Sequence, residues 1–116
     1  FGNSSVYARD NIVSLLDKTS RQVSDTAEFI TLCQEMHIAV NPILEASHFT
    51  KGRTYCAAIC LIVASANLMQ IKQSDLAKST GYSISTIRIQ AKKILQMLGY
   101  DSLKQISGKT IGEMIK

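Results

Sequence analysis

The segment KQSDLAKSTGYSISTIRIQAKKIL, from Lys72 to Leu95, divides into two short amphipathic stretches on either side of Gly81. The first stretch, Lys72–Ser79, has the length of a short helix with Leu76 and Ala77 turned inward. Gly81 supplies the permissive backbone that a tight turn needs. Two short helices joined by a glycine turn predict a helix-turn-helix over residues 72–98.

The second stretch begins with a suitable N-cap residue, Ser83. After it, apolar residues recur at helical spacing and form one stripe: Ile84, Ile87, Ala91, Ile94, Leu95 and Leu98. The other sides of this helix carry hydroxyl groups and positive charges. Because the second helix of a helix-turn-helix enters the major groove with its N-terminal part, this pattern predicts a DNA-binding face.

Each polar residue of this helix has an expected role. We expect Ser85 and Thr86 near the floor of the groove, and Arg88 on a base edge or a phosphate. The lysines that follow should meet phosphates. The full set of candidate DNA-binding residues is Arg53, Lys72, Gln73, Ser83, Ser85, Thr86, Arg88, Lys92 and Lys93. The alternative for the same residues is a solvated helix face in an ordinary bundle.

The segment YCAAICLIVASANLM, Tyr55–Met69, is apolar on almost every side. A helix without a polar face belongs in the centre of a bundle. Its small side chains would let neighbouring helices approach closely. The sequence therefore predicts an all-α domain of five main helices around a hydrophobic central helix.

Further stretches complete the expected organisation. The pattern predicts helices over 10–18 and 24–38 and a break at Asn41-Pro42. Ser24 or Asp25 can cap the second helix, and Glu28 lies at capping-box distance from Asp25. A short helical turn should follow over 42–49, and a linker over 50–54. Residues 1–9 are expected to form a flexible terminus. The expected main domain spans 10–99, and 100–116 are expected to form a helical extension split at Gly108.

The charges are distributed unevenly along the 116 residues, which fit one domain. Residues 1–50 contain three Lys/Arg and six Asp/Glu, a net charge of −3. Residues 51–116 contain ten Lys/Arg and three Asp/Glu, a net charge of +7. This asymmetry predicts that the basic half meets an anion, with nucleic acid as the leading candidate and an uneven solvated surface as the alternative.

Other functional classes find little support in the sequence. Three cysteines form no even disulfide framework and favour a reducing compartment. No metal-ligand spacing links Cys33, Cys56 and Cys60 with the two histidines, His37 and His48. No apolar run is long enough for a membrane span, no signal peptide is visible, and no catalytic motif occurs. We therefore expect no enzyme, no metal or cofactor, no membrane association and no small-molecule substrate.

The stretch from Gly52 to Leu95 resembles the second cyclin-like repeat of the transcription factor IIB family. Three motifs contribute to the resemblance: GRT at 52–54, YCAAICLIVAS at 55–65, and KQSDLAKSTGYSISTIRIQAKKI at 72–94. The resemblance implies a five-helix cyclin-like fold for residues 10–99. It also implies that the protein is a divergent member of this family, because Tyr55 stands where the family has a proline after the GRS motif.

The family resemblance implies binding to promoter DNA upstream of the TATA box. Arg88 follows Thr86 and Ile87 and matches the family's base-contacting arginine, whereas Ser85 replaces an apolar residue that touches DNA in the family. The implied partners are double-stranded promoter DNA, TATA-binding protein and RNA polymerase, assembled in a pre-initiation complex. The implied location is the nucleus, or the cytoplasm of an archaeal cell.

Two alternatives remain. Cyclin-like domains also act as protein-binding scaffolds without DNA contact, and the basic half would then bind an acidic protein. A free-standing bacterial-type helix-turn-helix regulator is the other alternative, but it would normally bring a dimerisation element that this sequence does not reveal. Salt-dependent binding to duplex DNA distinguishes DNA binding from the scaffold.

Overall fold

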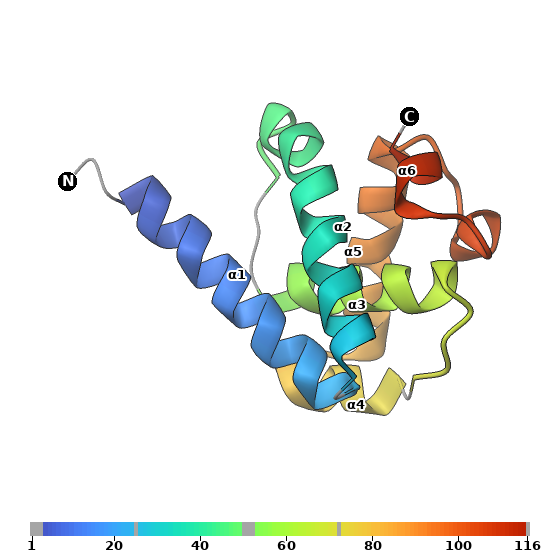
Figure 1. Cartoon of the computed structure of the whole chain (residues 1–116), viewed down its shortest axis with the longest axis horizontal. Helices are drawn as coiled ribbons and strands as arrows, with labels where there is room; N and C mark the ends of the chain where they lie inside the picture. Colours follow the sequence, from blue (N-terminus) through green and yellow to red (C-terminus); the bar gives the residue numbers. More distant parts are fainter. Residues whose placement is uncertain (1–3, 25, 50–52, 72, 116) are drawn as a thin grey trace.

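The computed structural model describes residues 4–24, 26–49, 53–71 and 73–115, and within these ranges the chain is helical with no strand (Figure 1). The main elements are α1 (Ser4–Val23), α2 (Ala27–Ala46), α3 (Arg53–Ala66), α4 (Gln73–Thr80) and α5 (Ile84–Met97). A 3₁₀ turn, η1 (Leu103–Ile106), and a short helix, α6 (Ile111–Met114), follow. The expected all-α class is confirmed.

Helix α3 is the centre of the structure. Its residues 55–64 and Ala66 are all buried, and it contacts α1, α2, α4, α5 and η1. Figure 1 shows α3 running across both α2 and α5. The expected burial of this apolar segment is confirmed, although the helix ends at Ala66 and not at Met69. It ends there because Leu68 adopts φ +56° and the Met69 N–H donates to the Ala64 carbonyl at 2.8 Å, a left-handed helix ending.

Helix α1 is much longer than the expected 10–18. It begins at Ser4, so residues 4–9, expected as a flexible terminus, lie in the helix, and it continues to Val23. Two hydroxyl residues near its end, Thr19 and Ser20, are buried, and each is hydrogen-bonded to a backbone carbonyl of the preceding turn. Thr19 donates to the Leu15 carbonyl at 2.8 Å and Ser20 donates to the Asp17 carbonyl at 2.9 Å. Because Thr19 and Ser20 are polar, the sequence pattern did not indicate that this part of α1 is buried.

Helix α2 corrects the expected break at Asn41-Pro42, because it continues to Ala46 with Pro42 inside it. Pro42 is exposed, whereas Leu44, two residues later, is fully buried. Burial of Leu44 offsets the backbone hydrogen bond that the proline removes. The N-cap is Thr26, whose hydroxyl accepts from the Phe29 N–H at 3.4 Å. Of the two expected capping residues, Ser24 is not the N-cap, and Asp25 lies outside the described residues.

The expected linker over 50–54 and the C-terminal segment over 100–116 also differ in part from expectation. Residues 50–52 of the expected linker lie outside the described residues, and Thr54 already belongs to α3. Gly108 adopts φ +81° and divides the tail into η1 and α6 as expected. Its N–H donates to the Ala66 carbonyl at 2.8 Å. Ile106 and Met114 join the main core, so the tail packs against the end of α3.

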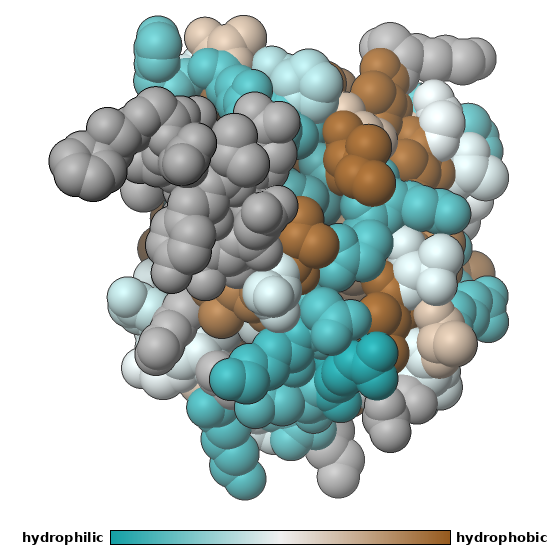
Figure 2. All heavy atoms as spheres, turned by 60° about the vertical axis from the view of Figure 1, so that its left-hand side comes forward, coloured by the Kyte–Doolittle hydropathy of each residue, from teal (hydrophilic) through white to brown (hydrophobic). Residues whose placement is uncertain are grey.

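The surface carries scattered apolar side chains. On the face shown in Figure 2 they appear as separate patches among polar residues. The large apolar residues most exposed in the described part of the chain are Val13, Ile38, Leu68, Tyr82, Ile89 and Met97. No helix in the described ranges is both long and apolar enough to cross a bilayer.

Candidate nucleic-acid interface

The turn between α4 and α5 is held by hydrogen bonds from one threonine. The buried Thr80 hydroxyl donates to the Leu76 carbonyl at 3.1 Å and accepts from the Tyr82 N–H at 3.2 Å. Between them Gly81 adopts φ +78°, which a side-chain-bearing residue adopts only under strain. Leu76 is fully buried and anchors α4 to the core. The path from α4 into α5 is therefore fixed by the backbone as well as by packing.

The start and rotation of α5 follow from its cap and its buried stripe. Ser83 is the N-cap as expected, and its hydroxyl accepts from the Thr86 N–H at 3.3 Å. The predicted apolar stripe faces the core, where its fully buried members are Ile87, Ala91, Ile94 and Leu95. Because these residues cannot turn outward without losing the core, the side of α5 that meets solvent is also fixed.

The most outward line of α5 runs through Ser85, Ile89 and Lys93. Successive helical residues are turned by roughly 100°, so residues four apart fall on nearly the same side. All three side chains are exposed, and Ile89 has 57% of its surface exposed. Ile89 was not among the candidate residues. The signal for it was present, because it is an apolar residue outside the buried stripe.

The three cations of α5 divide between two sides of the helix. Arg88 and Lys92 are one turn apart and line one cavity together with Asp101. Lys93 does not line that cavity, and it points roughly 100° away from Lys92 around the helix. If α5 lay in the major groove of duplex DNA, the phosphates on each side of the groove would therefore face a positive charge.

The remaining candidates have different positions. The Thr86 hydroxyl lies 3.0 Å from the Ser83 hydroxyl, so both take part in the N-cap. Lys72 lies outside the described residues, and so do the side chains of Arg53 and Gln73. The structure thus gathers the other six candidates on α5 and its N-cap: Ser83, Ser85, Thr86, Arg88, Lys92 and Lys93.

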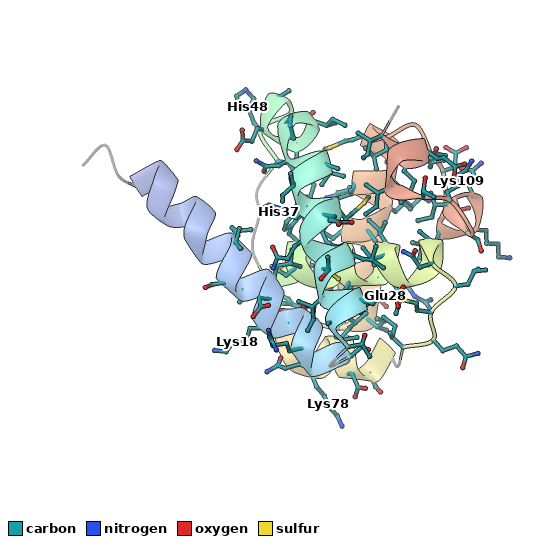
Figure 3. The ribbon with its side chains drawn as sticks, viewed as in Figure 1. Lys18, Glu28, His37, His48, Lys78 and Lys109 are labelled. Carbon is teal, nitrogen blue, oxygen red and sulfur yellow. The ribbon has the colours of Figure 1, made fainter. Side chains whose placement is uncertain are left out.

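Several other lysines lie apart from this cluster. Figure 3 shows Lys18, Lys78 and Lys109 at three separate edges of the molecule. Lys109 places its ammonium group 5.9 Å from the centre of the Tyr100 ring, a cation–π arrangement. By comparison, α5 carries three cations within about one and a half turns.

The cysteines form a buried cluster between α2 and α3. Cys33, Cys56 and Cys60 are all buried, and the sulfur atoms of Cys33 and Cys60 lie 3.9 Å apart. Burial raises the pKa of Cys56 to about 12. The hydrogen bond to Cys33, together with burial, raises the pKa of Cys60 well above its ordinary value. In the described ranges, no three His, Cys, Asp or Glu residues are arranged to hold a metal ion.

Comparison with known proteins identifies no matching family model, no matching curated protein and no matching solved structure. The likeness to transcription factor IIB therefore rests on the motifs at 52–65 and 72–94.

Proposed function

We propose that this protein binds duplex DNA through a helix-turn-helix formed by α4 and α5. The observation that carries the proposal is the outward face of α5. There Ser85, Ile89 and Lys93 form an exposed line, and Arg88 and Lys92 lie beside it. This combination of hydroxyl, apolar and cationic side chains on one short helix matches the chemistry of a major groove.

Each group on this face has a partner in the groove. Lysine and arginine side chains bind phosphates and displace condensed counterions, which supplies most of the affinity. The Ser85 hydroxyl can exchange hydrogen bonds with a base edge, and Ile89 can pack on a thymine methyl group. Arg88 lies about one turn from the N-cap, which places it in the part of a recognition helix that reaches bases.

We further propose that the domain is a divergent transcription factor IIB-like, cyclin-like repeat. The sequence Thr86-Ile87-Arg88 and the apolar helix α3 support this proposal, because both match the family's motifs. In this role the domain binds promoter DNA and helps TATA-binding protein and RNA polymerase assemble the pre-initiation complex. It would act in a nucleus, or in the cytoplasm of an archaeal cell.

Titration of a fluorescent duplex with the whole chain tests DNA binding. With four or five phosphate contacts, the logarithm of the binding constant should fall against the logarithm of the salt concentration with a slope of about −4. Ile89→Asp should weaken binding at least about tenfold, because it places an anion on the groove-facing side. Absence of binding at low salt would contradict the proposal.

An exposed isoleucine elsewhere provides the matched control. Ile38 lies on α2 and has 69% of its surface exposed, comparable with Ile89. Ile38→Asp makes the same chemical change and the same change in net charge. It should leave DNA affinity within about twofold once the small effect of net charge is included. Equal losses from the two variants would show that α5 is not the binding face.

A second titration tests the transcription factor IIB-like role. The duplex carries a TATA box and is first saturated with TATA-binding protein. We expect the chain to bind this complex more tightly than the same duplex alone. Equal affinity for the two would leave DNA binding intact and contradict the family role.

The alternative function is a cyclin-like protein-binding scaffold. The net charge of +7 over residues 51–116 supports it, because such a charge can attract an acidic protein as well as DNA. This function predicts no salt-dependent DNA binding and no effect of Ile89→Asp on DNA. The duplex titration therefore distinguishes the two functions.

A further inference from the structure

A cavity of about 290 Å³ lies between α3, α5 and the segment that leads into η1. Its buried lining is apolar and comes from Leu61 of α3 and Leu95 of α5, with the half-buried Leu103 beside them. Its exposed lining is polar and includes Arg88 and Lys92 of α5. The cavity therefore has an apolar base and a charged rim.

The charges at the rim select an anion. Among the residues that line the cavity, Arg88 and Lys92 carry a positive charge and Asp101 carries a negative charge, so the lining has a net charge of one positive unit. Ser65 and Ser102 also line the cavity, and their hydroxyls can donate hydrogen bonds to an anionic oxygen. Ser102 makes no capping hydrogen bond with its side chain at the start of η1. A monoanion is the charge state that this rim neutralises.

The size and apolar base of the cavity set the rest of the ligand. An apolar protein cavity of about 150 Å³ holds a benzene molecule. The volume here is therefore enough for a six-membered ring together with a carboxylate group. The half-buried Leu103 and the methylene groups of Arg88 and Lys92 would contact the ring above the buried Leu61 and Leu95, and the carboxylate would meet the two cationic groups.

We propose that this cavity binds a small aromatic carboxylate. The inference rests on the cavity's own residues and goes beyond DNA binding, because a ligand of this kind can bind with no nucleic acid present. A failure to bind DNA would leave it unaffected, and a failure to bind the carboxylate would leave the DNA proposal unaffected.

Titration of the whole chain with sodium benzoate tests the proposal by ¹H–¹⁵N NMR, at constant total salt. We expect saturable shifts with a dissociation constant of about 1 mM, an affinity suited to a ligand of this size. The largest shifts should fall at Ser65, Lys92 and Ser102. Benzamide keeps the ring without the charge, and acetate keeps the charge without the ring. Each should bind at least about fivefold more weakly.

Two lysine variants complete the experiment. Lys92→Gln removes a rim cation and should weaken benzoate binding about three- to fivefold. Lys78→Gln removes the same charge from α4, at another edge of the molecule (Figure 3), and should leave the dissociation constant unchanged. The ¹H–¹⁵N spectrum shows that each variant is folded. Benzamide binding as tightly as benzoate, equal losses from the two variants, or shifts that never saturate would overturn the proposal.

Discussion

The Nδ1 atom of His37 lies 2.6 Å from the hydroxyl oxygen of Tyr55, and this hydrogen bond joins α2 to the central helix α3. Both residues are buried. Their rings meet edge to face, with centroids 5.6 Å apart, and the ring of Phe49 also meets that of Tyr55 edge to face, with centroids 6.1 Å apart. The pair is thus a polar contact inside an aliphatic core, where a hydrogen bond matters more than at the surface.

Tyr55→Phe should lower the free energy of unfolding by about 1–2 kcal/mol. The substitution keeps the ring and removes only the hydroxyl that meets His37. Urea unfolding followed by circular dichroism measures the change. Tyr82→Phe is the control, because Tyr82 is exposed and its loss of a hydroxyl should cost less than about 0.5 kcal/mol. Equal effects from the two substitutions would show that the His37 hydrogen bond adds no stability.

Stability should also fall at alkaline pH. Burial raises the pKa of Cys56 to about 12 in the folded chain, above the value of about 8.5 expected for an unfolded thiol. The folded state therefore keeps this proton at pH values where the unfolded state loses it. The resulting stabilisation is complete below the pKa that the Cys56 thiol has in the unfolded chain. It is lost as the pH rises through the pKa that the thiol has in the folded chain. Burial also raises the pKa of Tyr55, which acts in the same direction.

Urea unfolding at intervals from pH 7 to pH 11 measures this dependence. The free energy of unfolding should be nearly constant up to about pH 8 and then decline. Cys56→Ala removes one of the responsible groups and should make the decline less steep. An unchanged slope in this variant would show that Cys56 is not responsible for the decline.

The two helices around Gly81 could be predicted because their signals are local. Gly81 marks the turn, Ser83 provides the cap, and the apolar stripe from Ile84 to Leu98 sets the buried side. All three are visible within one short segment. In contrast, the continuation of α2 through Pro42 depends on the burial of Leu44, which only the packed structure decides.

The cavity could not be predicted from the sequence for a similar reason. It combines Leu61 and Ser65 of α3 with Arg88 and Lys92 of α5 and with Asp101 after it. Periodicity gives the buried side of each helix but not which helices will lie together. The sequence consequently placed Arg88 and Lys92 on a DNA-binding face but did not indicate the neighbouring carboxylate.

The cations of α5 should differ in how they affect DNA binding. Ile87 is fully buried and fixes the rotation of α5, so it sets the direction of the neighbouring Arg88. Arg88→Ala should cost about 1–3 kcal/mol on a preferred site and relax sequence preference there. Lys92→Ala and Lys93→Ala should weaken all sequences alike and lower the salt slope by roughly one unit each.

Titration of each folded variant against the preferred site and a scrambled duplex measures these effects. Both duplexes are tested in the presence of TATA-binding protein. If Arg88→Ala loses equal affinity on both sequences, Arg88 binds a phosphate and does not read a base. If all three variants bind like the parent chain, this face does not touch DNA.

Asp101 should oppose DNA binding, because its carboxylate lines the same cavity as Arg88 and Lys92. A phosphate that approaches these cations is repelled by the nearby negative charge. Asp101→Asn keeps the size of the side chain and removes the charge. At low salt it should strengthen binding to duplex DNA about two- to fourfold, and the gain should shrink as salt shortens the range of the repulsion.

Glu35→Gln makes the same change in net charge on the exposed surface of α2 and is the control. A local effect requires Asp101→Asn to exceed Glu35→Gln clearly at low salt, and matching gains would mean that only the net charge of the protein matters.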